Sequence, residues 1–189
     1  MAIDTTLYHN QNAIIAKIQT ALTSMLTDLG VTGWQVLRAN QTTIQAVQNK
    51  SVYYDIISKR RIGTQGAKSV LGANGWLDKS VWYEEYLVQV GAFLQRDPDT
   101  DTSSTVTSSD IISLLQGCVN TNNALGAKNY FSEDWVQLIK STSIRELDYE
   151  TDSGLREKMP QFDFLLVVEQ IISKGIESVD DIEMNAYRV

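Results

Sequence analysis

The side chains that most often carry out chemistry are few in this chain of 189 residues. His9 is the only histidine and Cys118 the only cysteine, so a Ser-His-Asp or Cys-His site must use one of them. His9 lies in a polar stretch before the first predicted helix, and Cys118 lies on the apolar stripe of a later one. We therefore expect an exposed terminal histidine and a buried structural thiol. One residue of each type nearly excludes the usual zinc ligand sets.

A group of carboxylates has the spacing that begins a calcium-binding loop. Asp97, Asp99 and Asp101 form the pattern D-x-D-x-D. An EF-hand loop continues with glycine at its sixth position and glutamate at its twelfth. Here those positions hold Thr102 and Ser108. The stretch is better interpreted as a solvated acidic loop than as a cation site.

The glycine-rich segment and the adjacent glutamates also fail to predict a reaction. Residues 63–75 contain four glycines but neither G-x-G-x-x-G nor the Walker A pattern, so no phosphate-binding loop is indicated. Glu84 and Glu85 are neighbours in a predicted strand, where successive side chains point to opposite faces. They therefore cannot act together as an acid–base pair.

One compact basic cluster occurs in the chain, and it consists of Lys59, Arg60 and Arg61. It is small and has no interleaved aromatic residues, unlike surfaces that bind single-stranded nucleic acid. We interpret it as the solvated end of a strand or as an ion-pairing contact with another subunit. Because no catalytic, metal or cofactor site emerges, we expect that the protein is not an enzyme and has no cofactor.

Composition predicts one globular domain spanning residues 1–189. Hydrophobic residues make up 43% and charged residues 21%, and no low-complexity linker divides the sequence. The formal net charge of −7 argues against a protein that grips nucleic acid by its phosphates. It leaves open a protein that DNA passes without binding. We find neither a signal peptide nor an apolar run of membrane-spanning length, and we expect synthesis in the cytoplasm and no membrane partner.

Periodicity predicts the elements that would position these residues. Residues 80–96 alternate as one strand of roughly 50 Å, far longer than an ordinary strand, so one end is expected to leave the domain. Apolar residues at helical spacing predict a helix over 10–29, capped by Gly30. A second helix is predicted over 108–120, introduced by a capping-box pattern from Thr107 to Asp110.

Further strands are predicted at 34–39, 52–62, 142–149 and 162–172, the last of them central in the sheet. Strands 52–62 and 80–96 should form a long antiparallel hairpin joined by a glycine-containing loop at 63–79. The pattern at residues 132–144 is mixed: residues 134–149 could be strand, but a short helix or an irregular piece is favoured. Residues 175–189 could add a strand at 182–187 or form a C-terminal arm. Together the pattern predicts an α+β fold with an antiparallel or mixed sheet, a long β-hairpin and two main helices packed on one face.

Several of these segments, taken together, resemble a family of phage proteins. They are VYYDIISKRRIGTQG, EYLVQVGAFLQRDPD, TSSDIISLLQ and FDFLLVVEQII, and the similarity runs from about residue 14 to residue 172. The chain is similar here to the neck or tail terminator proteins that join head and tail in tailed phages. The resemblance implies a virion protein that forms a ring, usually a hexamer. Such a ring would close the tail tube, contact the tube or sheath and the head connector, and let DNA pass.

For such a ring we expect the basic cluster to pair with the acidic loop of a neighbour, near the ends of the hairpin. The residues predicted at the subunit interface are Lys59, Arg60, Arg61, Glu84, Gln95, Asp97, Asp99 and Asp101. Three alternatives stay open: another head-completion or tail-completion protein, a small-molecule-binding module closed by residues 63–79 with Trp76, and a metal-dependent hydrolase or nuclease. The binding module requires an apolar pocket beside residues 63–79. The hydrolase requires at least two converging carboxylates.

Overall fold

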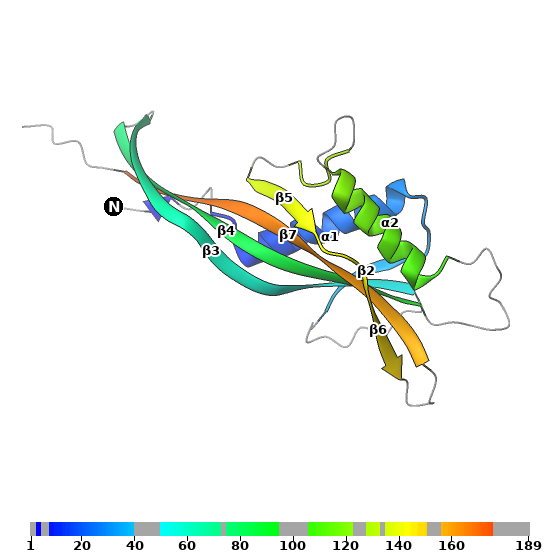
Figure 1. Cartoon of the computed structure of the whole chain (residues 1–189). Helices are drawn as coiled ribbons and strands as arrows, with labels where there is room; N and C mark the ends of the chain where they lie inside the picture. Colours follow the sequence, from blue (N-terminus) through cyan, green and yellow to red (C-terminus); the bar gives the residue numbers. More distant parts are fainter. Residues whose placement is uncertain are drawn as a thin grey trace, which may run out of the picture.

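The computed structural model describes residues 3–4, 8–39, 50–72, 75–94, 106–122, 128–132, 135–150 and 156–175. The elements are β1 (Ile3–Asp4), α1 (Gln11–Asp28), β2 (Gln35–Arg38), β3 (Lys50–Gly72), β4 (Gly75–Leu94), α2 (Ser108–Thr121), β5 (Val136–Ser141), β6 (Arg145–Glu150) and β7 (Arg156–Gly175). The seven strands of the described residues form one open mixed sheet (Figure 1). The predicted α+β class is therefore confirmed.

Strand β7 is the centre of this sheet, as its apolar sequence predicts. The main strand order is β1-β7-β4-β3-β2. Strand β4 follows one edge of β7, while β6, β5 and β1 succeed one another along its other edge. All of these pairings are antiparallel except that of β2 with β3, which is parallel.

Both helices begin and end where local sequence signals place them. The side chain of Asn10 accepts a hydrogen bond from the Ala13 amide at the start of α1, and Gly30 follows the helix with a φ of 68°. At the start of α2, Thr107 and Asp110 form the predicted capping box. These caps satisfy amide groups that a helix terminus otherwise leaves without a partner. Within the described residues, no helix is long and apolar enough to span a membrane.

The helices cover one face of the sheet, and the core lies between them and that face (Figure 1). This arrangement confirms the prediction that both helices pack on one side. Large buried side chains come from α1, from α2 and from the three central strands. They include Ile14, Ile18, Leu22, Met25, Ile111, Ile112, Leu115, Tyr54, Tyr86, Phe162 and Phe164.

The predicted hairpin is present, but the predicted loop at 63–79 is wrong. Strands β3 and β4 pair in the antiparallel sense from Lys50–Leu94 to Gly72–Gly75, and two register shifts interrupt the pairing. One shift falls between Ile62 and Gly66, where Gly63 has a φ of 72°. Gly63 therefore lies at an irregularity within strand β3 and not in a loop. The polar sequence was misleading because most described side chains of residues 63–69 are exposed to solvent.

The prediction for residues 132–144 is also wrong in part. Instead of a helical turn, residues 136–141 form β5, with alternating buried and exposed positions at its start. A register shift between Leu138 and Lys140 interrupts the alternation and hides the strand in the sequence. The next strand, β6, begins at Arg145 and ends at Glu150, close to the predicted bounds of 142 and 149. The prediction of a strand at 182–187 falls outside the described residues.

Candidate assembly site

An arm of strands extends away from the helices. Beyond the part of the sheet that the helices cover, β3, β4 and β7 continue side by side (Figure 1). The pairing of β4 with β7 reaches Leu77–Gly175, and β1 pairs with Lys174 and Ser173 of β7. The length of the 80–96 strand is thus explained: part of it belongs to the core, and part belongs to the arm.

Within the described residues, the outer edge of strand β3 pairs with another strand over only part of its length. Its partner on that side, β2, pairs only with Ser51–Tyr54. From Ile56 to Gly72, no strand in the described part of the chain pairs with this edge. Unpaired backbone N–H and C=O groups along a strand form a template for a strand of another chain. The arm therefore offers a surface suited to protein–protein contact.

The basic cluster lies in the middle of β3, not at its end as predicted, because β3 continues to residue 72. The Lys59 Nζ atom lies 2.9 Å from a Glu84 carboxylate oxygen. The Arg60 Nε atom lies 2.6 Å from a Glu85 carboxylate oxygen. Adjacent residues of a strand point to opposite faces, so these two ion pairs lie on opposite sides of the hairpin. The expectation that Glu84 and Glu85 cannot act together is consistent with this geometry.

The third cation of the cluster also has partners inside the protomer. The guanidinium of Arg61 lies 4.8 Å from the centre of the Trp82 ring and donates a 3.0 Å hydrogen bond to Gln65. The pairing of the cluster with a neighbour's acidic loop stays a prediction. The remaining residues predicted for that contact lie outside the described residues, and they are Gln95, Asp97, Asp99 and Asp101.

Glu84 is a buried carboxylate held by four side-chain donors. It accepts hydrogen bonds from Tyr86 Oη at 2.7 Å, Lys59 Nζ at 2.9 Å, Gln170 Nε2 at 3.0 Å and Trp82 Nε1 at 3.3 Å. Burial alone raises the pKa of Glu84, but these four donors outweigh it and hold the pKa below its ordinary value. The same burial, together with donation to Glu84, raises the pKa of Tyr86 to about 12.

The fully buried Gln170 extends this network to the N-terminal segment. Its Oε1 accepts from the His9 amide at 2.8 Å, and its Nε2 donates to the His9 carbonyl at 2.9 Å. The imidazole of His9 stacks on Trp135 at 3.8 Å between ring centres and 13° between planes. The prediction of an exposed His9 is therefore wrong, because the ring is half-buried. Cys118 is likewise half-buried rather than buried, and burial raises the pKa of its thiol.

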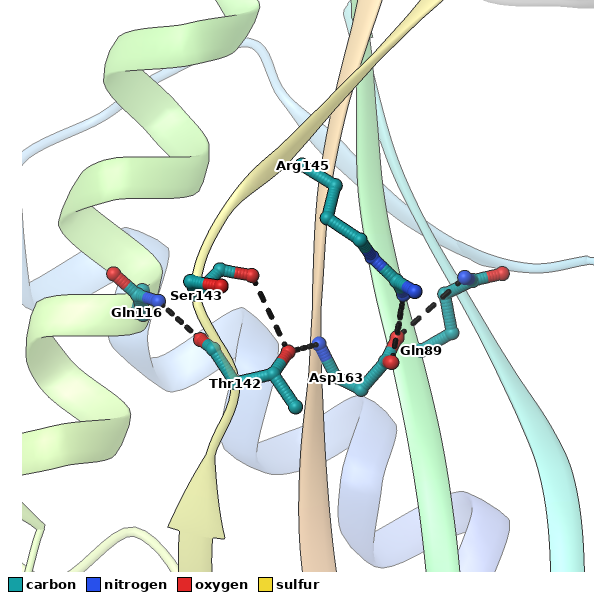
Figure 2. Close-up of polar contacts among 6 residues, drawn as sticks. All are labelled: Gln89, Gln116, Thr142, Ser143, Arg145 and Asp163. Carbon is teal, nitrogen blue, oxygen red and sulfur yellow. Dashed lines mark hydrogen bonds and ion pairs between the residues drawn. The ribbon is translucent and has the colours of Figure 1, made fainter.

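A second polar cluster fixes β6 to β7 (Figure 2). Arg145 Nη2 contacts both carboxylate oxygens of Asp163, at 2.8 and 2.7 Å. Thr142 accepts from the Asp163 amide at 2.9 Å and donates its own amide to the Asp163 carbonyl at 2.7 Å. The Gln116 side chain of α2 donates to the Thr142 carbonyl. The segment between β5 and β6 is thus tied to both β7 and α2.

The alternative functions find no geometric support in these residues. A hollow of about 300 Å³ lies on the sheet and is lined by Ala39, Tyr53, Tyr54, Asp55, Gln89, Gly91, Met159 and Gln161. This hollow is not beside residues 63–79, where the binding-module hypothesis requires a pocket. Residues 63–72 are strand, so they do not form a closing loop. Among the described residues, no three His, Cys, Asp or Glu side chains gather to hold a metal ion.

The described features define a class: an open mixed α+β sheet with helices on one face and a projecting arm with a free strand edge. The comparison with known families identifies the particular family. Residues 13–178 match the family model described as E217 gateway protein gp29, and the chain belongs to this family. It is a family of phage gateway proteins, which is consistent with a structural role in joining head and tail. No curated protein matches the sequence.

Proposed function

We propose that the protein is a structural component of the phage neck and that it assembles into a hexameric ring. The ring would close the tail tube and join it to the head connector. Membership in a phage gateway family supports a head–tail position. The observation that supports assembly is the edge of β3: from Ile56 to Gly72, no strand of the described residues pairs with it. Monomeric proteins usually shorten, twist or cover such an edge.

A ring requires one particular kind of contact at this edge. Two β3 edges that paired with each other would make an isologous contact that ends at a dimer, so in a ring the β3 edge meets a different surface of the neighbouring copy. Contacts between unlike surfaces propagate by rotation, and they close into a ring when the rotation divides a full turn. The partners in the virion would be the tail tube or sheath on one side and the head connector on the other.

The charge of the chain suits a channel for DNA. A formal net charge of −7 disfavours retention of phosphates, so DNA can move through a ring of this protein without being held. We propose no catalytic role. The two residues that would be needed for common nucleophilic sites are engaged in packing: His9 stacks on Trp135, and Cys118 is a half-buried thiol with a raised pKa.

The test is the assembly state of the purified full-length chain. Sedimentation velocity over a wide concentration range should reveal one discrete oligomer, and negative-stain images should reveal rings with a central opening. The same preparation should bind purified tail tubes at one end only. A chain that stays monomeric at high concentration, and also in the presence of tail tubes, would overturn the proposal.

A further inference from the structure

We propose that the helix-free face of the sheet carries a docking site for an arginine side chain of a partner protein. The site is the hollow of about 300 Å³ on the sheet, and strands β3, β4 and β7 supply most of its lining. A hollow of this size is at the lower end of the range for small-molecule pockets, so it suits a single side chain. The site is complete within one protomer and does not require a ring. That the partner is another component of the neck rests on the proposed function.

The hollow exists because one residue in a row across the sheet has no side chain. Gly91 of β4 lies opposite Tyr53 of β3 on one side and opposite Gln161 of β7 on the other. Val90, which precedes Gly91, belongs to the core beneath the helices, so Gly91 and its two partners belong to the opposite face. Gly91 therefore forms the floor of the hollow, and Tyr53 and Gln161 form walls on either side of it.

Two glutamines of the lining have hydrogen-bonding capacity that the protomer does not use. Gln89 Nε2 donates a 3.5 Å hydrogen bond to Asp163, and Figure 2 shows its carbonyl oxygen turned away from that carboxylate. Within the described part of the chain, this oxygen and the Gln161 side-chain amide make no hydrogen bond. Both glutamines are half-buried. The hollow thus offers carbonyl acceptors to a group that brings several N–H donors.

The charge in the hollow favours a cation. Asp55 is the only charged residue among the described residues that line it. Beyond Gln89, Arg145 and Asp163 form an ion pair of 2.7 Å that has no net charge. Asp55 would repel a phosphate or a carboxylate, which disfavours DNA as the occupant. An apolar side chain would cover the Asp55 charge and the glutamines without offering them a hydrogen bond, and such burial costs free energy.

The other walls of the hollow favour arginine over lysine. Tyr53 contributes an aromatic ring and Met159 a thioether. A guanidinium is planar and weakly hydrated, stacks on aromatic rings and presents five donors at once. An ammonium is a compact, strongly hydrated point charge with three donors. An arginine can therefore stack on Tyr53 while it donates to Asp55 and to a glutamine. Arginine is also enriched at protein–protein interfaces, where lysine is depleted.

NMR of the full chain, labelled with carbon-13 at the methionine methyl groups, tests the inference. The chain has four methionines, of which Met159 lines the hollow and Met25 is fully buried in the core. The Met159→Leu variant identifies the reporter signal. The probe is N-acetyl-arginine methylamide, and the lysine and norleucine compounds of the same design are the controls. We expect the arginine probe to shift the Met159 signal saturably at millimolar concentration, as is usual for a small fragment, and to leave the Met25 signal in place.

Two variants probe the charge and the floor of the hollow. Asp55→Asn removes the charge and keeps an oxygen that can accept from the Ile56 amide, and it should weaken binding of the arginine probe about five- to tenfold. Gly91→Val fills the floor and should abolish the shift. The added Cβ would lie 3.6 Å from its nearest neighbour, the Pro160 carbonyl oxygen, which is an ordinary contact. An unchanged Met25 signal checks that each variant keeps its fold.

The outcomes separate this inference from the proposed ring. No shift of the Met159 signal with the arginine probe would overturn the docking site. An equal shift with the norleucine or the lysine probe would overturn the choice of arginine, and an unchanged titration in Asp55→Asn would overturn the role of the charge. None of these results bears on ring formation, which negative stain measures. A saturable arginine titration without rings would instead support the site and contradict the proposed function.

Discussion

Glu84→Gln should destabilise the fold more than the equivalent change at the neighbouring residue, Glu85→Gln. Glu84 is 8% exposed and accepts hydrogen bonds from four side chains. The change to glutamine keeps the size of the side chain and removes its charge. It also replaces one acceptor oxygen by an amide donor, which then faces the donating groups around it.

The size of the loss in unfolding free energy depends on which of the four donors can bond to water instead of to residue 84. Lys59 has a side chain that is 42% exposed, so its ammonium can turn to solvent. Tyr86 and Gln170 are fully buried and cannot do so. Hydrogen bonds to a charged group contribute about 1.5–3 kcal/mol each and those between neutral groups about 0.5–1.5 kcal/mol. Weakening the two buried bonds should therefore lower the free energy of unfolding by about 2–3 kcal/mol at neutral pH.

The loss should depend on pH, and its sign follows from the pKa of Glu84. That pKa is lower in the folded protein than its ordinary value near 4.5. The charged carboxylate therefore stabilises the fold at pH values above the ordinary pKa. This stabilisation disappears as the pH falls through the lowered pKa of the folded protein. The difference between parent and Glu84→Gln should be largest near pH 7. It should begin to shrink below about pH 5 and continue to do so as the solution becomes more acidic.

Urea unfolding monitored by tryptophan fluorescence measures both effects, since Trp82 itself donates to Glu84. Glu85→Gln is the matched control. Its partner Arg60 is 70% exposed, and an ion pair of that kind contributes about 0–1 kcal/mol. Equal losses in the two variants, or a loss in Glu84→Gln that is the same at pH 4 and pH 7, would refute the reasoning.

Three further predictions use other parts of the chain. Gln170→Leu removes both hydrogen bonds to the His9 backbone and the one donated to the Glu84 carboxylate, so unfolding should cost about 3–6 kcal/mol less and hydrogen exchange at the N-terminal segment should accelerate. Gly63→Ala should destabilise the arm by about 1–2 kcal/mol because φ is 72° there. At Gly66 φ is not positive, and an added Cβ would lie 3.9 Å from the Val81 carbonyl oxygen, so Gly66→Ala should leave hydrogen exchange in the arm unchanged. Thr107→Ala should lower the melting temperature through a loss of about 0.5–2 kcal/mol, and Thr107→Ser should not.

The parts of the fold that local sequence encodes are the parts that could be predicted. Both helices carry their own stop and start signals, such as Gly30 after α1 and the pair Thr107 and Asp110 before α2. The hairpin and the central β7 follow from long runs of strand-forming residues. In each case the information lies within a few residues of the element that it specifies, which is the range over which a sequence pattern can be interpreted directly.

Residues 63–72 of β3, which form one side of the arm, lack the pattern that identifies a strand, whereas the extension of the 80–96 strand beyond the core follows from its length. Alternation of apolar and polar residues arises when one face of a strand is buried, and most described side chains of residues 63–69 are exposed. The contact of Gln170 with His9 was missed for a different reason. The two residues are separated by 161 positions, and no local feature of either one specifies the other. Nothing in the sequence of β6 alone indicates that it is an edge strand.

The distribution of residues along β4 separates stability from assembly. From Tyr86 to Leu94 its alternate residues are buried beneath the helices, and this part belongs to the core. From Gly75 to Val81 it belongs to the arm. Glu84 lies between them, where its ionised carboxylate closes the polar end of the core by collecting donors from β3, β4 and β7. Changes on the arm side should therefore alter ring formation with little effect on unfolding, whereas changes from Glu84 onward should alter both, since a ring cannot form from protomers that have lost their core.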